Sequence, residues 1–154
     1  MAEGLLRSAL STHVCEFASV GSAGTSTPPG LPASVHSVTA CRELGIDISG
    51  HQSRPLSPAL VNEADLILTM EAHHRQAIVT AWPQATARTY VLSAFALPDQ
   101  YTGSSGGRGM PPGVADPIGL ALEEYRHTRD EIAGYLKQAM PRIESAIQAA
   151  AGRS

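Results

Sequence analysis

The spacing of apolar side chains along the chain predicts several helices. The first covers residues 1–10, where strong helix formers place apolar side chains on one face; these side chains are Leu5, Leu6, Ala9 and Leu10. Helical spacing returns at residues 32–44, 57–62, 71–82 and 120–151. Gly45 is expected to end the second of these helices and Ser57 to cap the third, while Pro141 falls inside the last one.

Short apolar runs between these helices predict β-strands at residues 15–24, 64–70 and 88–95. The run at 64–70 is unbroken, which is typical of a parallel strand covered on both faces. Alternating strands and helices indicate an α/β fold, with a parallel sheet and helices on both of its faces. Residues 25–32 and 96–115 are rich in Pro and Gly and are predicted to be loops; the sequence suggests no role for the insertion from Gly103 to Gly109.

Composition narrows the class of protein. The chain has 154 residues, of which 43% are apolar, and is expected to form one domain. Its net charge is -3 with no Lys/Arg cluster, which argues against nucleic-acid and membrane-surface partners. Neither a run of 18 apolar residues nor a secretory signal is found, and two cysteines are too few for a disulfide framework, so a cytoplasmic location is expected.

Short motifs occur in a fixed order along the chain. They are Met1-Ala-Glu-Gly-Leu-Leu-Arg7, Ser22-Ala-Gly-Thr25, Gly45-Ile-Asp-Ile-Ser49 with His51-Gln-Ser-Arg54, Ala64-Asp-Leu-Ile-Leu-Thr-Met70, and Asp116-Pro117. The ordered set resembles the low-molecular-weight protein tyrosine phosphatases. The resemblance implies a flavodoxin-like fold with strand order 2-1-3-4. It also implies that the enzyme hydrolyses phosphotyrosine through a cysteinyl-phosphate intermediate and needs no cofactor. The substrates would be phosphorylated proteins or small aryl phosphates.

In that family the motif at Met1 follows a strand and a phosphate-binding loop of pattern Cys-x5-Arg-Ser-Pro. The first, central strand and the nucleophile are therefore expected to be missing here. Six residues after Cys15 stands Gly21, and six after Cys41 stands Asp47, so neither cysteine has the arginine of that pattern. The chain as printed is expected to be inactive, and unstable or aggregation-prone because a central strand is lost. Two explanations stay open: a longer phosphatase whose start lies upstream, or a non-catalytic fragment that binds a partner.

The resemblance assigns roles to a few residues. Asp116 would be the general acid that protonates the leaving oxygen and then the base that activates water, since a carboxyl group can give and take the same proton. Ser22 and His51 would hydrogen-bond the phosphate loop and hold its backbone. The alternatives are that Asp116 caps the last helix and that Ser22 and His51 are ordinary turn and loop residues. Arg54 would either pair with a carboxylate under the site or be an ordinary surface arginine.

Related activities and a metal site are further alternatives. Protein-arginine phosphatases and arsenate reductases share this fold, and Ile118 stands where tyrosine-specific members commonly have an aromatic residue. Arsenate reductases use extra cysteines near the middle of the chain, and none is found there. Glu71, His73 and His74 form a possible ligand set, but adjacent histidines on a helix point about 100° apart, so no metal is expected.

Overall fold

The computed structural model of the chain describes residues 1–10, 18–101 and 110–152. Contacts divide the chain into two compact units. The first unit contains Met1–Leu56 and Asp116–Gly134, and the second contains Ser57–Ala115 and Tyr135–Ser154. Each unit is described by itself below, and the single domain stays a prediction.

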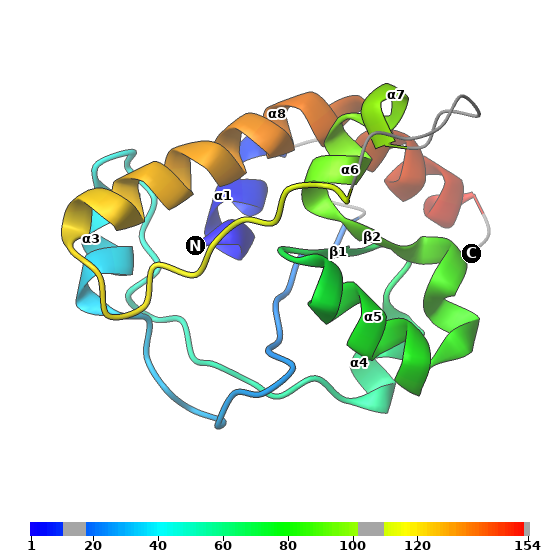
Figure 1. The fold of residues 1–154 in the computed structure, drawn as a ribbon, viewed down its shortest axis with the longest axis horizontal. Helices are drawn as coiled ribbons and strands as arrows, with labels where there is room; N and C mark the ends of the chain where they lie inside the picture. The colour runs from blue at the N-terminus through cyan, green and yellow to red at the C-terminus, as the bar shows by residue number, and fades with distance from the viewer. Residues whose placement is uncertain (11–17, 102–109, 153–154) are drawn as a thin grey trace. The chain divides into compact units, whose positions relative to one another are not determined.

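Helices make up most of the described secondary structure (Figure 1). In chain order the elements are α1 (Ala2–Ala9), α3 (Val35–Arg42), α4 (Pro58–Glu63), β1 (Ile67–Thr69), α5 (Ala72–Ala81), the 3-10 helix η1 (Pro83–Arg88), β2 (Thr89–Val91), α6 (Leu92–Ala96), α7 (Pro98–Tyr101) and α8 (Leu122–Ala151). Along the described residues, no helix is long and apolar enough to cross a membrane.

The second unit contains a parallel strand pair, as the α/β pattern predicts. β1 and β2 are aligned with Ile67 opposite Thr89 and Thr69 opposite Val91. Helix α5 connects the two strands and contacts both of them, which is the β/α arrangement expected of a parallel pair. Buried side chains of this unit's core come from α4, α5, β2, α6 and α8; they include Val61, Ile78, Val91, Leu92, Phe95 and Ile143.

Both predicted strands of this unit are shorter than expected. In β1, Thr69 is buried whereas Ile67 and Leu68 are only half-buried, so the expectation of a strand covered on both faces is wrong. Only Thr89–Val91 of the predicted strand at 88–95 is extended, and Leu92–Ala96 forms α6 instead. Leu and Ala favour a helix, and a short apolar run does not distinguish a buried helix from a buried strand. Part of the predicted loop at 96–115 is also helical, as α7; Gly103 to Gly109 lie outside the described residues.

The predicted helix ends are confirmed where a local signal exists. The Ser57 hydroxyl accepts a hydrogen bond from the Leu60 N–H and caps α4, with proline in the first turn. Gly45 has φ of +74°, the left-handed conformation that follows a helix end. Residues 32–34 do not belong to the second helix as predicted, because Ser34 caps α3 by accepting from the Ser37 N–H.

Helix α8 runs through Pro141 without interruption of its helical assignment. Next to this proline, the Arg142 guanidinium lies 4.1 Å from the centre of the Phe95 ring and donates to the Phe95 carbonyl oxygen. A cation over an aromatic face is attracted by the ring quadrupole. This contact joins α8 to α6 within the second unit.

The strand predicted at residues 15–24 is wrong for residues 18–23, and only residues 15–17 stay untested. Cys15 and Phe17 lie outside the described residues, and residues 18–23 have no strand assignment. Gly24 alone forms a parallel bridge, with Pro55. Its N–H donates to the Arg54 carbonyl oxygen and its own carbonyl accepts from the Leu56 N–H, so this segment runs beside residues 54–56.

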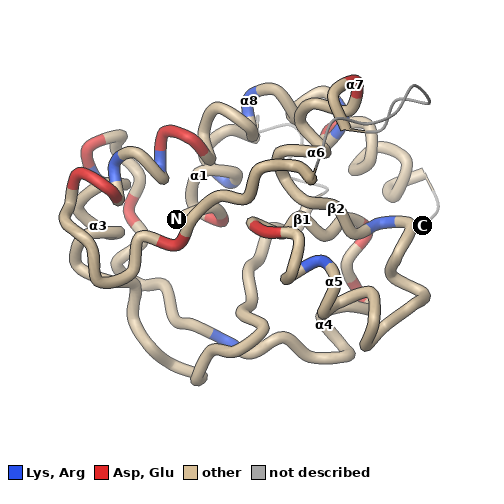
Figure 2. The backbone as a smooth tube through the Cα atoms, in the orientation of Figure 1, with Lys and Arg blue, Asp and Glu red and all other residues tan. Residues whose placement is uncertain are grey.

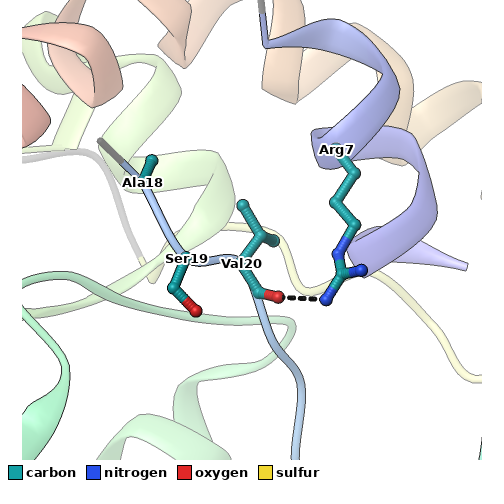
Figure 3. A pocket seen from close by; sticks show the side chains of 4 residues that line it. All are labelled: Arg7, Ala18, Ser19 and Val20. Carbon is teal, nitrogen blue, oxygen red and sulfur yellow. Dashed lines mark hydrogen bonds between the residues drawn. The ribbon is translucent and has the colours of Figure 1, made fainter. Parts of the chain in front are cut away.

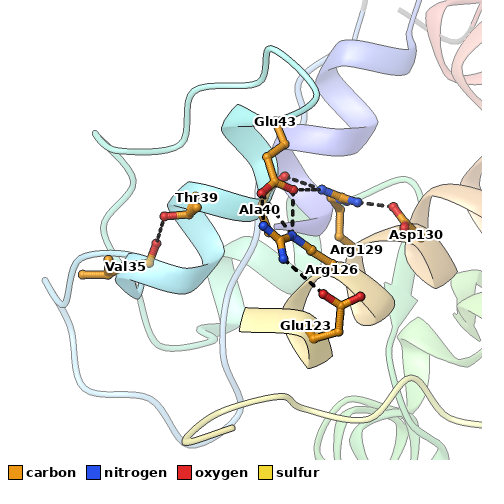
Figure 4. A network of polar contacts seen from close by, with 8 residues as sticks. All are labelled: Val35, Thr39, Ala40, Glu43, Glu123, Arg126, Arg129 and Asp130. Atoms are coloured by element: carbon orange, nitrogen blue, oxygen red, sulfur yellow. Dashed lines mark hydrogen bonds and ion pairs between the residues drawn. The ribbon is translucent and has the colours of Figure 1, made fainter. Parts of the chain in front are cut away.

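A charged cluster joins α3 to the first half of α8 in the first unit (Figure 4). The Glu43 carboxylate accepts hydrogen bonds from Arg126 at 2.6 Å and from Arg129 at 2.9 Å. Arg129 is buried, and it also donates to the Ala40 carbonyl oxygen and to Asp130. Charges of both signs follow one another along this part of α8 (Figure 2). The hydrogen bond from Arg126 is the main reason that the pKa of Glu43 falls from 4.5 to about 2.

This shift predicts how acid affects stability. The folded pKa of Glu43 is below its ordinary 4.5. The ionised carboxylate therefore contributes its full share to the free energy of unfolding above about pH 4.5, and this share is lost as the pH falls through about 2. Glu43→Gln should therefore be less stable than the natural chain at pH 6, and the gap should narrow as the pH falls from about 4.5 through about 2. Urea unfolding midpoints across this range measure the gap. The exposed Glu63→Gln is the matched control, and a gap that does not change with pH would contradict the prediction.

Candidate functional site

Ser22 and His51 lie beside the same carboxylate, that of Glu3 in the first turn of α1. The Ser22 hydroxyl donates to Glu3 Oε2 at 2.6 Å, and His51 Nδ1 lies 3.7 Å from the same oxygen. Arg7, one turn later on α1, pairs with Glu3 Oε1 at 2.9 Å. The Glu3 side chain is 19% exposed and the His51 side chain 32%, so the cluster is partly screened from water. We call Glu3, Ser22 and His51 the Glu3 cluster.

Close packing of α1 brings His51 to the Glu3 cluster. A Cβ atom at Gly4 would lie 2.6 Å from Ile48 Cγ2 and 3.2 Å from Ile46 Cγ2, so only glycine lets α1 approach this segment so closely. Ile48 is buried, and its carbonyl oxygen accepts from the His51 N–H. The glycine of the Met1 motif therefore positions the loop that carries His51.

Arg54 fixes the segment that carries Ser22. Its Nε donates to the Ser22 carbonyl oxygen at 2.8 Å. Its guanidinium occupies the space where a Cβ atom of Gly21 would lie. Of the two alternatives for Arg54, the described part of the chain shows no carboxylate partner; the side chain is exposed and bonds a backbone carbonyl. Arg54 thus supports the backbone around Ser22.

A surface hollow of about 420 Å³ lies next to α1, lined by Arg7, Ala18, Ser19 and Val20. Arg7 donates to the Val20 carbonyl oxygen at 2.6 Å across one side of it (Figure 3). Arg7 therefore contacts both Glu3 and the backbone of the following segment. The hollow is open to solvent, and Arg7 is the charged residue among the described ones that line it.

Asp116 is exposed on the loop between Val114 and α8. Its Oδ1 accepts a hydrogen bond from the Ile118 N–H at 3.1 Å. Since α8 begins only at Leu122, the alternative that Asp116 caps the last helix is wrong. The structure does not join Asp116 to the Glu3 cluster by any hydrogen bond or ion pair among the described residues. Its catalytic role stays a prediction.

Cys41 does not resemble a nucleophile. It is fully buried on α3, and burial raises the pKa of its thiol, although the charge of the N-terminus and of Arg129 acts in the opposite direction. A thiol held protonated is a poor nucleophile and behaves as a small apolar core residue. The other cysteine, Cys15, lies outside the described residues.

Sequence reasoning gave Glu3 no role, although it belongs to the motif at Met1. The available signal was an acidic residue in the first turn of a helix, four residues before Arg7. That signal is common on exposed helices, where it indicates only a weak surface pair. Its contact with Ser22 spans 19 positions in sequence, and no local pattern reveals such a contact.

Comparison with known proteins identifies the family. A family model described as low molecular weight phosphotyrosine protein phosphatase matches residues 1–149. The protein-arginine-phosphatase of Bacillus subtilis (strain 168) is 33% identical over 144 residues, covering 94% of this chain and 87% of that protein. A probable low molecular weight protein-tyrosine-phosphatase, EpsP of Ralstonia nicotianae, is 36% identical over 145 residues, with the same coverage of 94% and 87%.

Solved structures agree with this assignment. The YwlE arginine phosphatase from Geobacillus stearothermophilus superposes with a TM-score of 0.78 at 28% identity, covering 94% of this chain and 83% of that one. The low molecular weight protein tyrosine phosphatase from T. tengcongensis gives 0.73 at 28% identity, covering 92% and 88%. They confirm the predicted α/β fold class. The chain belongs to the low molecular weight phosphotyrosine protein phosphatase family.

Proposed function

We propose that this domain serves the hydrolysis of phosphorylated side chains of proteins, with Asp116 as the general acid and base. The observation that carries the proposal is the family match over residues 1–149, which includes Asp116-Pro117. Asp116 supports it further, because it is exposed on a loop and has its side chain held by the Ile118 N–H. An exposed carboxylate with a fixed orientation can reach a bound phosphate ester.

The reaction requires a thiolate that attacks phosphorus. In the proposed sequence the sulfur–phosphorus bond forms as the bond from phosphorus to the leaving atom breaks, and Asp116 donates its proton to that atom, which is oxygen in phosphotyrosine and nitrogen in phosphoarginine. Asp116 then takes a proton from water, which attacks phosphorus and releases inorganic phosphate and the thiolate. Because Cys15 and Cys41 lack the Cys-x5-Arg pattern, the chain as printed is expected to hydrolyse no aryl phosphate.

The Glu3 cluster is proposed to support the phosphate-binding loop. Ser22 and His51 both contact Glu3 at the beginning of α1. A helix N-terminus that follows a phosphate loop contributes backbone N–H groups and a favourable dipole for the anion. A shared carboxylate would hold both side chains in fixed positions there, with the Ser22 oxygen still able to accept a hydrogen bond from a loop N–H.

Phosphotyrosine is the first substrate candidate, and phosphoarginine is the second. Ile118 favours the second, because its side chain is aliphatic and 75% exposed beside Asp116 and offers no ring to stack on an aryl group. The Bacillus subtilis relative is named a protein-arginine-phosphatase, and the Ralstonia nicotianae relative a probable protein-tyrosine-phosphatase.

We also propose that the protein is located in the cytoplasm, whichever of the two activities it has.

Adding a strand and a loop of the family pattern Cys-x5-Arg-Ser-Pro before Met1 tests the proposal. The extended chain should hydrolyse phosphorylated peptides, while the same extension with serine in place of the added cysteine should not. The ratio of kcat/KM for a phosphoarginine and a phosphotyrosine peptide decides between the substrate candidates. A folded extended chain that hydrolyses neither peptide would overturn the proposed function.

A further inference from the structure

Three side chains with metal-binding atoms gather at the beginning of α5, directly after β1. Glu71 is the residue before the helix, and His73 and His74 belong to its first turn. One ligand atom from each lies within 4.8 Å of the others. His73 Nδ1 is 3.4 Å from Glu71 Oε2, and the centres of the two imidazole rings are 4.0 Å apart.

Adjacent histidines on a helix were expected to point too far apart to share a metal ion, but the ligand atoms of His73 and His74 lie close together. Neighbouring helical residues leave the backbone about 100° apart, but an imidazole is long enough for its side-chain torsions to bring it back towards its neighbour. The two rings are tilted by 45°, and each offers a nitrogen within 4.8 Å of the other ligand atoms. The direction of the Cα–Cβ bonds alone therefore did not predict where the imidazole nitrogens lie.

We propose that Glu71, His73 and His74 bind a divalent transition-metal ion, for which Zn²⁺ is the best match. Two imidazole nitrogens and one carboxylate oxygen are a ligand set that zinc accepts in four-coordinate sites. Mg²⁺ and Ca²⁺ prefer oxygen ligands only, so they fit this set poorly. The proposal does not rest on the proposed phosphatase activity.

The Glu71 side chain packs against neighbouring backbone, and its carboxylate is not used by the helix. Glu71 makes no side-chain hydrogen bond to the helix it precedes, so its carboxylate is not used as a cap. A Cβ atom at Gly113 would lie 2.8 Å from Glu71 Cγ, which shows that the backbone there packs closely against this side chain. That backbone is itself fixed, because the Val114 N–H donates to the Met70 carbonyl oxygen.

The charged side chain next to these three residues and their exposure to solvent also allow a cation to bind. Arg75 follows His74, but its Nε donates to the Thr89 carbonyl oxygen at 2.9 Å, which ties its side chain to β2. The His73 side chain is 68% exposed and that of Glu71 is 35% exposed, so water can occupy a fourth position. Ligand atoms about 2.0–2.2 Å from one zinc ion lie roughly 3–4 Å apart, and rotation of exposed side chains can close the remaining gap.

Titration of the extended chain that carries serine in place of the added cysteine, with zinc chloride in a calorimeter, tests the proposal. We expect one Zn²⁺ bound per chain, with a Kd in the micromolar range. His73→Gln and His74→Gln should each weaken the affinity by at least about tenfold, since each removes one of three protein ligands. His127→Gln, on the exposed face of α8, should leave the affinity unchanged. Circular dichroism confirms that each variant keeps its helices.

Substitution of cobalt(II) for zinc gives a second measurement that identifies the ligands. We expect visible bands of a four-coordinate ion without the charge-transfer band of a thiolate ligand. A thiolate band, an affinity that both histidine variants retain, or no binding below about 1 mM zinc would each overturn the proposal.

Discussion

Replacing Asp116 by asparagine in the chain extended by the Cys-x5-Arg loop is expected to lower kcat/KM for phenyl phosphate by roughly 10²–10³. Asparagine keeps an oxygen for the hydrogen bond from the Ile118 N–H, so the loop should keep its shape. What is lost is the proton that the leaving oxygen needs as its bond to phosphorus breaks. The rate constant kcat/KM reports steps up to the first irreversible one, which includes this transfer.

The identity of the leaving group makes this prediction specific. p-Nitrophenolate is a stable anion that needs little protonation, so Asp116→Asn should lower kcat/KM for p-nitrophenyl phosphate much less than for phenyl phosphate. Asp99→Asn, an exposed aspartate of α7, is the matched control and should change neither value. Equal losses on both substrates would mean that Asp116 does not act as the general acid.

Replacing Glu3 by alanine is expected to lower the free energy of unfolding by about 1.5–3 kcal/mol, since it removes a charged acceptor from a partly buried hydroxyl donor. Ser22 would lose its 2.6 Å hydrogen bond, and Arg7 and His51 would lose the carboxylate that they face. Urea unfolding of the extended chain measures the change.

Glu3→Gln separates the hydrogen bond from the charge. Glutamine can still accept from the Ser22 hydroxyl, and the ion pair to Arg7 is a surface pair that contributes only about 0.3–0.5 kcal/mol. The glutamine variant should therefore lose less than half as much stability as the alanine variant. Glu63→Ala at the end of α4 is the control and should change stability by less than about 0.5 kcal/mol. Equal losses for the two Glu3 variants would show that charge, and not the hydrogen bond, dominates the cluster.

Sequence alone predicted those features that depend on neighbouring residues. Ser57 caps α4 and Gly45 follows α3 in the left-handed conformation, as expected, because capping and glycine preferences act within one or two turns. The strand–helix–strand order of β1, α5 and β2 was likewise visible from apolar periodicity. The ordered motifs identified the family, which the comparison over residues 1–149 confirmed.

Features that depend on distant contacts were not predicted. Leu92–Ala96 became α6 and not strand, since an apolar run packs in either form and its surroundings decide between them. Arg54 turned out to bind a carbonyl oxygen 32 positions away. The side-chain torsions that bring His73 and His74 together likewise follow no periodic rule.

The sequence of this protein thus determines its helix ends, its order of elements and its motifs, whereas the tertiary structure determines which partners its polar side chains find. The physical reason is the distance along the chain over which each interaction acts. A cap or a left-handed glycine is decided by the backbone within a few residues, whereas the carboxylate of Glu3 meets Ser22 and His51 only after α1 has packed through Gly4 against Ile48. Apolar packing sets that approach, and the polar contacts form where it leaves donors and acceptors facing each other.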